Sequence, residues 1–152
     1  MRARGLDEAL RDAFANGTPI LGICLGAQIV LEFTEEGRRD CLGLIEGDVS
    51  SGSTFPTEPS RCRISAGTTS ISARPHPLLK GIRTGDEFYF VHSYFAVPTH
   101  TENVYGTTEY GIRFCSILGK ENLFATQFHL EKSGRMGLAI LDEFQRWDGR
   151  PC

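Results

Sequence analysis

The sequence predicts an α/β fold in which helices pack on a mixed β-sheet. Segments with helical periodicity alternate with short apolar segments typical of strands, a pattern that favours an α/β sandwich over an all-helical or all-β domain. The 152 residues suffice for one core and are too few for two, so we expect a single domain over residues 1–152. With 40% hydrophobic and 23% charged residues, the composition is that of an ordinary globular protein.

The first half of the chain is predicted to place a buried strand between two helices. Residues 5–15 carry apolar side chains at intervals of four, which predicts a helix that Asn16-Gly17 would end. Pro19–Cys24 is a short apolar run between turn residues, as expected of a fully buried strand. Helical spacing returns over Ala27–Phe33, and Glu35–Asp40 is predicted to be a charged loop.

The second half is predicted to be rich in strands that pair antiparallel, joined to a more parallel first half. Four apolar runs lie close together with turn residues between them, which favours antiparallel pairing. Before them, Ser50–Ser60 is the most loop-like segment, and we expect it to be a surface excursion within one domain. The predicted strands cover Glu87–Val91, Val104–Tyr110, Arg113–Leu118 and Leu123–Phe128.

An amphipathic helix is predicted over residues 134–147. Apolar residues recur there at helical spacing, so one face of the helix should pack on the sheet. This predicted apolar face consists of Met136, Leu138, Ile140, Leu141 and Phe144.

Charge, cysteines and hydropathy argue against several classes of function. The net charge is -3, without the basic stripe that phosphate-backbone binding requires, so we expect no nucleic-acid partner. The five cysteines form no CxxC pair and no metal-like spacing with histidine, so we expect neither a disulfide scaffold nor a structural zinc site. We also expect no other metal and no cofactor. The first residues contain no apolar run long enough for a signal peptide or a membrane span, which favours a cytoplasmic protein without membrane partners.

A candidate nucleophile lies where the buried strand is predicted to turn into the second helix. Gly22-Ile23-Cys24-Leu25-Gly26 has the GxCxG form of a nucleophile elbow, in which both glycines keep side chains out of a crowded turn. The dipole of the following helix would lower the pKa of the Cys24 thiol, and the Leu25 N–H would point at a developing oxyanion. Alternatively, Cys24 is a small buried hydrophobic residue, as most free cysteines are.

A candidate base for this thiol is His129, which follows the apolar run Leu123–Phe128. Glu131 comes two residues later, and side chains at i and i+2 project to the same side of an extended chain, so the carboxylate can orient the imidazole. Such a His-x-Glu pair also occurs by chance. Together, the thiol, the imidazole and the carboxylate would suit acyl transfer.

The other histidines are weaker candidates for a base. His76 lies between two prolines and is predicted to be a turn residue, and His100 lies in a polar loop and is predicted to be solvated. His92 opens the tripeptide His92-Ser93-Tyr94 at the end of an aromatic strand, where polar loop groups would line a ligand pocket. A hydrogen bond from His92 to neighbouring backbone is the alternative.

Three stretches of the sequence resemble one protein family. They are PILGICLGAQIVLEF, EFYFVHSYFAV with TEYG after it, and ATQFHLEKSGRMGLAILDEF. The pattern GxCxGxQ marks the class-I glutamine amidotransferases, and FYFVHSY together with QFH-x-EKSG is most similar to the glutaminase subunits of imidazole glycerol phosphate synthases. The likeness runs over most of the 152 residues and implies a three-layer α/β sandwich with a mixed sheet.

The resemblance implies that the chain hydrolyses glutamine with a catalytic triad. Cys24 would attack the glutamine carboxamide, His129 would pass a proton to the departing ammonia, and Glu131 would orient His129. Water would then resolve the glutamyl thioester.

The resemblance also implies a substrate site and a partner. Gln28 and the backbone around Ser93 and Tyr94 would hold the glutamine. The ammonia would pass to a cyclase subunit with a (β/α)8 barrel, which makes imidazole glycerol phosphate in histidine biosynthesis. A similar pair of subunits can serve surface-polysaccharide sugar amidation, which is an alternative role.

The sequence departs from the family pattern at three places. Met1 matches a position in the helix before the nucleophile strand, so the N-terminal third of family members, with a glycine-rich loop that supplies a second oxyanion donor, would be missing. Leu130 replaces the usual proline between His129 and Glu131. Arg63–Ile71 replaces a stretch that carries Gly-Trp-Asn on the side facing the cyclase.

These departures lead to expectations for the chain as given. The strand Pro19–Ile23 would have an unpaired apolar edge, and we expect weak or absent glutaminase activity and poor solubility. The hypotheses are an active glutaminase subunit, an inactive fragment or interaction module of the same fold, and a cysteine hydrolase without ammonia transfer. The last would leave Gln28 and His92-Ser93-Tyr94 unexplained.

Overall fold

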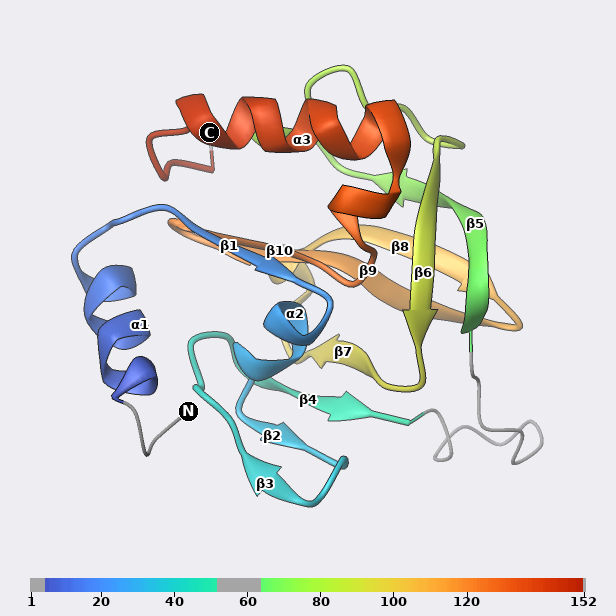
Figure 1. The fold of residues 1–152 in the computed structure, drawn as a ribbon. Helices are drawn as coiled ribbons and strands as arrows, with labels where there is room; N and C mark the ends of the chain where they lie inside the picture. The colour runs from blue at the N-terminus through green and yellow to red at the C-terminus, as the bar shows by residue number, and fades with distance from the viewer. Residues whose placement is uncertain (1–4, 52–63, 152) are drawn as a thin grey trace.

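The computed structural model describes residues 5–51 and 64–151. Within these ranges the strands form one 10-stranded sheet, and its combination with helices confirms the predicted α/β class (Figure 1). The strands are β1 (Ile20–Ile23), β2 (Phe33–Thr34), β3 (Arg39–Asp40), β4 (Gly47–Ser50), β5 (Ile64–Ala73), β6 (Glu87–His92), β7 (Phe95–Pro98), β8 (Val104–Tyr110), β9 (Ile112–Lys120) and β10 (Leu123–Thr126).

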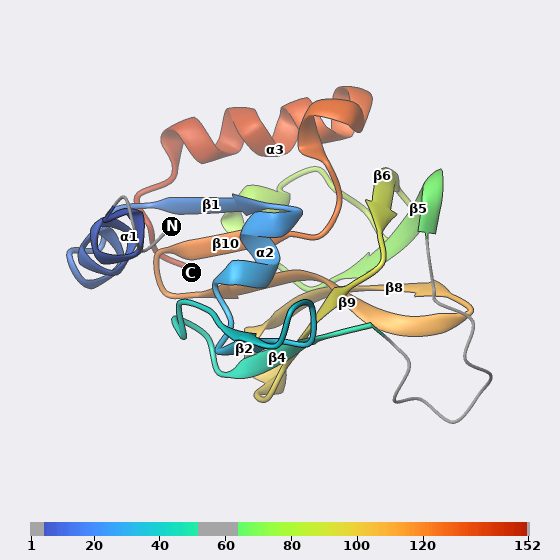
Figure 2. The same ribbon diagram turned by 60° about the horizontal axis from the view of Figure 1, so that its bottom comes forward.

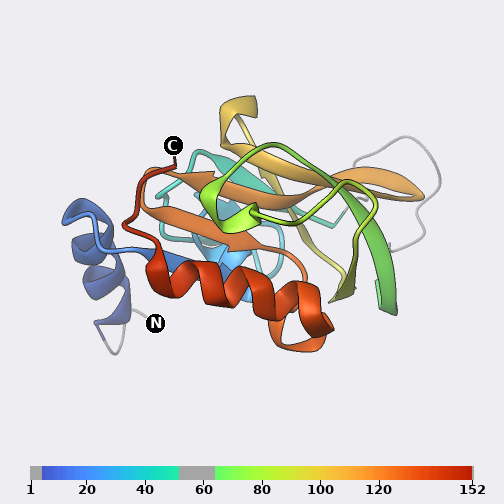
Figure 3. The same ribbon diagram turned by 90° about the horizontal axis from the view of Figure 1, so that it is seen from above.

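Helices cover both faces of the sheet around β1 and β10. α3 (Gly134–Arg146) lies on one face and α2 (Leu25–Ile29) on the other (Figures 1 and 2). α1 (Leu6–Ala15) confirms the first predicted helix and stands to one side, near the start of β1 (Figure 3). None of the helices in the described ranges is long and apolar enough to cross a membrane. Short 3-10 helices are η2 (Pro77–Leu79), η3 (Thr101–Asn103) and η4 (Leu130–Lys132).

β9 is the branch point of the sheet. Neighbouring strands follow the order β3-β2-β4-β7-β9-β8-β5-β6, and β9 also pairs with β10, which in turn pairs with β1. β8, β9 and β10 pair antiparallel, as predicted for the second half of the chain. The parallel pairs are β1 with β10 and β2 with β4, so parallel pairing involves the first half, as expected.

The helix predicted over Ala27–Phe33 is wrong in its C-terminal part. α2 ends at Ile29, and Phe33 lies in β2, which pairs parallel with β4. Tertiary pairing with β4 therefore overrides the local helical spacing. The charged loop predicted over Glu35–Asp40 also ends early, because its last two residues form β3, the antiparallel neighbour of β2.

β4, β5 and β7 are strands that apolar periodicity does not predict. β4 and β7 have 4 residues each, too few for alternation to be recognisable, and β5 is rich in serine and threonine. Ser50, expected in a loop, belongs to β4. Residues 52–60 of that predicted loop lie outside the described ranges.

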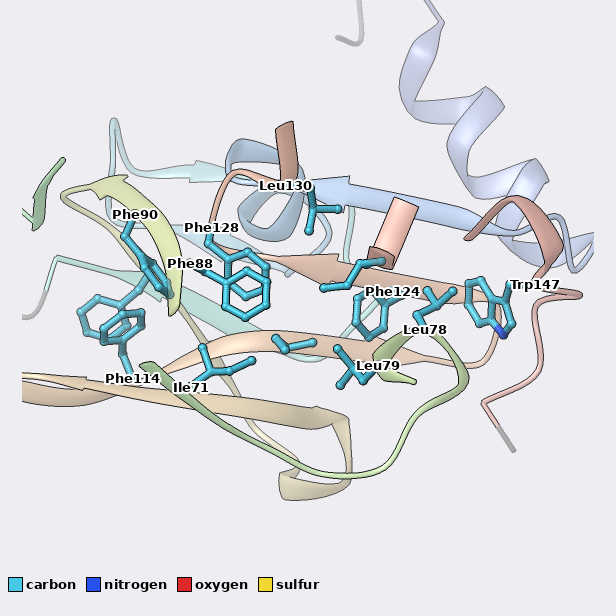
Figure 4. Packing of buried hydrophobic residues seen from close by; sticks show 13 residues of the cluster. Ile71, Leu78, Leu79, Phe88, Phe90, Phe114, Phe124, Phe128, Leu130 and Trp147 are labelled. Atoms are coloured by element: carbon cyan, nitrogen blue, oxygen red, sulfur yellow. The ribbon is translucent and has the colours of Figure 1, made fainter. Parts of the chain in front are cut away.

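Two hydrophobic clusters lie on opposite sides of β9. Neighbouring residues of a strand point to opposite faces, so Ile117 joins the cluster on the α3 side and Leu118 joins the cluster on the α2 side. In the cluster on the α3 side, Phe88 and Phe128 pack with ring centroids 4.2 Å apart, and Trp147 lies at the opposite end (Figure 4).

α3 confirms the amphipathic helix predicted over residues 134–147, but its apolar face is narrower than predicted. Ile140 is fully buried, and Met136, Leu141 and Phe144 pack against the cluster on the α3 side. Leu138 is 62% exposed, so its assignment to the buried face is wrong. Residues two apart on a helix face away from each other, and Leu138 therefore points away from Ile140.

β1 is less buried than predicted. Among the described strands it pairs with β10 alone, so the expected unpaired edge is present in the described structure. Ile20, Leu21 and Ile23 are half-buried, and only Gly22 is buried. The prediction of a fully buried strand over Pro19–Cys24 is therefore wrong, because burial on both sides requires a second neighbour.

Candidate active site

The C-terminal ends of β1 and β10 bring two sequence-distant segments to one edge of the sheet. The strands are parallel neighbours, with Ile23 opposite Thr126. Cys24 follows β1 directly, and its N–H donates to the Thr126 carbonyl at 2.8 Å. His129 comes shortly after β10, as the residue before η4. Because parallel strands end on the same side of a sheet, the predicted nucleophile and the predicted base lie at one edge.

Cys24 has the backbone geometry of a nucleophile elbow. Its φ of 51° and ψ of -98° lie outside the regions that non-glycine residues commonly adopt. Gly22 is required there, because a Cβ at this position would lie 2.9 Å from Ala125 Cβ and from the Gly26 carbonyl carbon. Gly26 departs from the expectation. A Cβ at Gly26 would meet nothing within 4 Å among the described residues, so this glycine does not relieve crowding.

Burial raises the pKa of the Cys24 thiol above its ordinary value, although hydrogen bonds from the Leu25 N–H and the Gln127 side chain lower it. The prediction that the helix dipole lowers this pKa is therefore wrong for the net shift. α2 has only 5 residues, so few peptide dipoles add up at its N-terminus. The Glu131 carboxylate also raises the pKa of the thiol. Cys24 is consequently protonated at neutral pH, so a nucleophilic role would require a base that removes the thiol proton.

His129 and Glu131 form a short hydrogen-bonded pair. The imidazole Nδ1 lies 2.6 Å from Glu131 Oε1, and the His129 side chain is 20% exposed. The hydrogen bond from His129 lowers the pKa of the Glu131 carboxyl, so the carboxylate is ionised at neutral pH. A carboxylate on Nδ1 leaves Nε2 as the ring nitrogen that can exchange a proton.

The main chain of His129 is fixed to β6. The His129 N–H donates to the Tyr89 carbonyl at 3.0 Å. Ser133 Oγ donates to the His129 carbonyl at 2.6 Å and accepts from the Tyr89 N–H at 3.0 Å. The thiol, imidazole and carboxylate pattern has no place for Ser133 or Tyr89, so the sequence does not single them out. The available signals are that both residues lie in the family-like stretches, Ser133 in QFH-x-EKSG and Tyr89 in FYFVHSY, and that a serine directly before a helix ordinarily indicates a cap.

Gln28 and Tyr94, both predicted to hold glutamine, are in contact. Gln28 Nε2 donates to the Tyr94 carbonyl at 2.8 Å, and His92 Nδ1 lies 2.9 Å from the same oxygen. This contact of His92 with backbone is the alternative that the sequence left open. Burial lowers the pKa of His92 to about 4, and its Nε2 is buried without a hydrogen-bond partner among the described residues. Ser93 lies between His92 and Tyr94 and is half-buried.

Gln127 is a polar neighbour of the thiol that the sequence pattern did not indicate. Its side chain is fully buried, and its Nε2 lies 4.0 Å from Cys24 Sγ. Its Oε1 has no hydrogen-bond partner among the described residues. The sequence signal for Gln127 is its place at the start of the stretch QFH-x-EKSG, two residues before His129.

The other histidines have structural contacts. His76 accepts a hydrogen bond from the Leu78 N–H at 3.2 Å, which confirms the predicted turn, and its ring packs on Phe124 with centroids 4.6 Å apart. His100 is exposed, as predicted, and lies 2.9 Å from a Glu46 oxygen. Across residues 5–51 and 64–151, no three His, Cys, Asp or Glu side chains are grouped so that they could hold a metal ion.

The family described as glutamine amidotransferase class-I matches residues 2–146. Similar curated proteins include the imidazole glycerol phosphate synthase subunit HisH of Neisseria gonorrhoeae, which is 42% identical over 147 residues, covering 94% of this chain and 69% of that protein. The subunit of the same name from Nitratidesulfovibrio vulgaris is 44% identical over 147 residues, covering 94% of this chain and 68% of that protein.

Solved structures share the fold at low sequence identity. A crystal structure of a glutamine amidotransferase matches with a TM-score of 0.66 and 15% identity, covering 97% of this chain and 70% of that chain. The structure of PurLQS from Thermotoga maritima matches with a TM-score of 0.68 and 16% identity, covering 93% and 67%. At these identities the likeness shows the fold alone.

Proposed function

The chain belongs to the class-I glutamine amidotransferase family, and on this premise we propose that it hydrolyses glutamine to glutamate and ammonia with Cys24, His129 and Glu131. One observation carries the proposal. The parallel pair β1 and β10 delivers Cys24 and His129 to one edge of the sheet, where Glu131 holds the imidazole at 2.6 Å.

The reaction begins with proton transfer, because burial raises the pKa of the Cys24 thiol and keeps it protonated. His129 Nε2 accepts the proton, and the Glu131 carboxylate on Nδ1 stabilises the imidazolium. The thiolate then attacks the carboxamide carbon of glutamine, so that a C–S bond forms and the carbonyl oxygen takes the negative charge. The Leu25 N–H, next to the elbow, is a donor for this oxyanion.

Collapse of the tetrahedral intermediate releases ammonia. His129 gives its proton to the carboxamide nitrogen, the C–N bond breaks, and Cys24 is left as a glutamyl thioester. Water attacks this thioester with His129 as the base, and the C–S bond breaks to give glutamate and the Cys24 thiol. His129 therefore alternates between base and acid, which requires a fixed ring orientation.

Gln28 and the Ser93-Tyr94 backbone are the proposed holders of the substrate glutamine. The hydrogen bond from Gln28 Nε2 to the Tyr94 carbonyl orients the Gln28 amide at 2.8 Å, so that its Oε1 can accept from the substrate amino group. The proposed recognition of the substrate thus involves α2, which begins directly after Cys24, and the turn between β6 and β7.

The proposed acceptor of the ammonia is a cyclase subunit with a (β/α)8 barrel that makes imidazole glycerol phosphate in histidine biosynthesis. The support comes from the relatives, which are 42% and 44% identical and are named as subunits of imidazole glycerol phosphate synthase. Free ammonia is lost to solvent, so direct transfer between subunits would explain why a glutaminase is paired with a synthase.

The test uses Cys24→Ser with a cyclase subunit from a relative. We expect this variant to lose glutamine-dependent product formation and to keep product formation with ammonium, because ammonium bypasses the thiol. Cys115→Ser is the matched control, since Cys115 is a buried thiol in β9 and should leave both activities intact. The measurements are ammonia release and cyclase product formation.

The outcomes separate the hypotheses. Loss of both activities in Cys24→Ser would contradict the mechanism. Absence of ammonia release from the wild-type chain, alone and with the cyclase, would support an inactive interaction module. If the wild-type chain releases ammonia from glutamine but the cyclase forms no product from it, the chain would instead supply another synthase, such as one for sugar amidation.

A further inference from the structure

Ser133 is the N-cap of α3, but its hydroxyl does not cap the helix. Serine at an N-cap usually accepts from a backbone N–H of the first helical turn, and this is worth about 1 kcal/mol. The Ser133 side chain makes no such bond. Its hydroxyl instead makes two bonds outside the helix, one to the carbonyl of His129 and one from the N–H of Tyr89.

These two bonds, with a third between backbone groups, join the His129 segment to β6. Ser133 Oγ donates to the His129 carbonyl at 2.6 Å and accepts from the Tyr89 N–H at 3.0 Å. The His129 N–H donates to the Tyr89 carbonyl at 3.0 Å. The Ser133 hydroxyl thus uses its one donor and one of its acceptor sites to bridge the His129 carbonyl and the Tyr89 N–H of β6.

The bridge formed by Ser133 lies just beyond the last hydrogen bond between this segment and β9. Gln127 is the last residue before His129 whose N–H bonds to β9, through the Ser116 carbonyl at 2.9 Å. Glu131 contacts His129 through side-chain atoms only, Oε1 to Nδ1, so this contact does not anchor the His129 main chain. On the α3 side, a Cβ at Gly137 would overlap the Leu130 carbonyl oxygen, so helix and turn are in close contact there.

We propose that Ser133 is a positioning residue for His129. Its hydroxyl fixes the main chain of His129 to β6, and this sets the approach of the imidazole to the Cys24 thiol. This inference rests on the proposed function for its kinetic part. A displacement of a catalytic group by about 1 Å can cost about 100-fold in rate, so loss of the bridge should lower turnover while substrate binding persists.

The experiment compares Ser133→Ala, Ser133→Thr and Asn122→Ala in the full chain. Ser133→Thr keeps the hydroxyl, so it is the conservative rescue. Asn122→Ala is the matched control, because Asn122 Nδ2 also donates to two carbonyls, those of Ala13 and Thr18, at the opposite end of β1 and β10. Asn122→Ala therefore removes a comparable bridge between a side chain and two backbone groups, and it leaves the His129 segment unchanged.

The readouts are kcat and KM for glutamine, and the pH dependence of Cys24 alkylation by iodoacetamide, followed on the Cys24 peptide by mass spectrometry. For Ser133→Ala we expect kcat to fall about 10- to 100-fold with KM within about twofold, and the midpoint of alkylation to move to higher pH. Ser133→Thr should restore both. Asn122→Ala should lower thermal stability and leave both readouts unchanged.

Three results would overturn the inference. The first is wild-type kcat and an unchanged alkylation midpoint in Ser133→Ala. The second is an equal loss in Asn122→Ala, which would indicate general destabilisation. The third is a failure of Ser133→Thr to restore either readout. If the wild-type chain hydrolyses no glutamine, the proposed function fails, and the alkylation midpoints alone then decide the role of Ser133.

Discussion

Cys24 and Cys115 differ in what their surroundings allow. Burial raises the pKa of both thiols, to about 12 for Cys115, which lies within β9. In the proposed mechanism Cys24 becomes a thiolate by passing its proton to His129, which lies at the same edge of the sheet with Glu131. The Cys115 thiol donates instead to the Ile117 carbonyl, which is not a base, so we expect Cys115 to be unreactive.

We predict that iodoacetamide at neutral pH labels Cys24 at least about 100-fold faster than Cys115, because alkylation requires an accessible thiolate. His129→Asn should slow the labelling of Cys24 about tenfold, since asparagine cannot accept the thiol proton. Peptide mass spectrometry of timed samples measures both rates. Equal labelling of the two cysteines in the native protein would contradict this assignment.

His76 should make the fold sensitive to acid. Burial lowers its pKa to about 4, below the ordinary value of 6.5, and its Nδ1 must be unprotonated to accept from the Leu78 N–H. Between these values the unfolded chain binds a proton that the folded chain does not. The free energy of unfolding therefore falls as the pH drops from about 6.5 to about 4, by about 1.4 kcal/mol per pH unit for each such histidine.

Urea denaturation between pH 7 and pH 4 measures this dependence. His76→Asn keeps a side-chain acceptor at the cap and removes the titration, so its stability should depend less steeply on pH. His92, whose pKa burial also lowers to about 4, should supply the remaining slope. Identical slopes for wild type and His76→Asn would show that His76 is not buried in its neutral form.

At the scale of the elements, the two glycines of the elbow should respond differently to substitution. Gly22→Ala would place a Cβ 2.9 Å from Ala125 Cβ, between β1 and its neighbours, whereas Gly26→Ala meets open space in the described structure. We expect Gly22→Ala to lower the free energy of unfolding by about 1–3 kcal/mol and to reduce glutaminase activity. Gly26→Ala should raise stability by up to about 1 kcal/mol, since alanine favours a helix interior.

Urea titrations and ammonia release measure both variants under the same conditions. A Gly26→Ala variant as damaged as Gly22→Ala would mean that the space beside Gly26 is filled in the working protein. The two glycines are indistinguishable in the GxCxG pattern, so only the structure separates their roles.

Elements with a clear period were predictable from the sequence, and short paired elements were not. α1, α3 and β6 match their predicted ranges within about two residues, because each carries an apolar pattern over two or more turns or several pleats. β4 and β7 gain stability from pairing with each other, which no local pattern records. The same applies to Phe33, which pairs with β4 instead of continuing α2.

For the whole molecule, the two hydrophobic clusters are joined through β9, so they should unfold together. Ile117 and Leu118 are both fully buried and face opposite clusters. We predict that Ile117→Ala and Leu118→Ala each lower the free energy of unfolding by about 2–5 kcal/mol. Each should shift one common transition, seen at the same urea concentration by circular dichroism and by Trp147 fluorescence. Separate transitions for the two probes would show that the clusters unfold independently.

The proposed triad could be assembled from the sequence because its members belong to recognisable segments, Gly22–Gly26 and the stretch around His129 and Glu131. The parts that hold the triad in place could not. The hydrogen bonds of Tyr89 to this segment use backbone groups, which any residue could supply, and Ser133 stands directly before a helix as an ordinary N-cap serine does. The sign of the Cys24 pKa shift also depends on burial, which the local motif does not reveal.

The hydrogen bond from the Cys24 N–H to the Thr126 carbonyl, 2.8 Å long, ties the elbow to the last residue of β10. His129 lies beyond β10, and its N–H is bonded to the Tyr89 carbonyl of β6 instead. A movement of β6 relative to β1 and β10 would therefore change the distance between the proposed nucleophile and the proposed base. A docking partner that displaced β6 in this way would alter the proposed proton transfer.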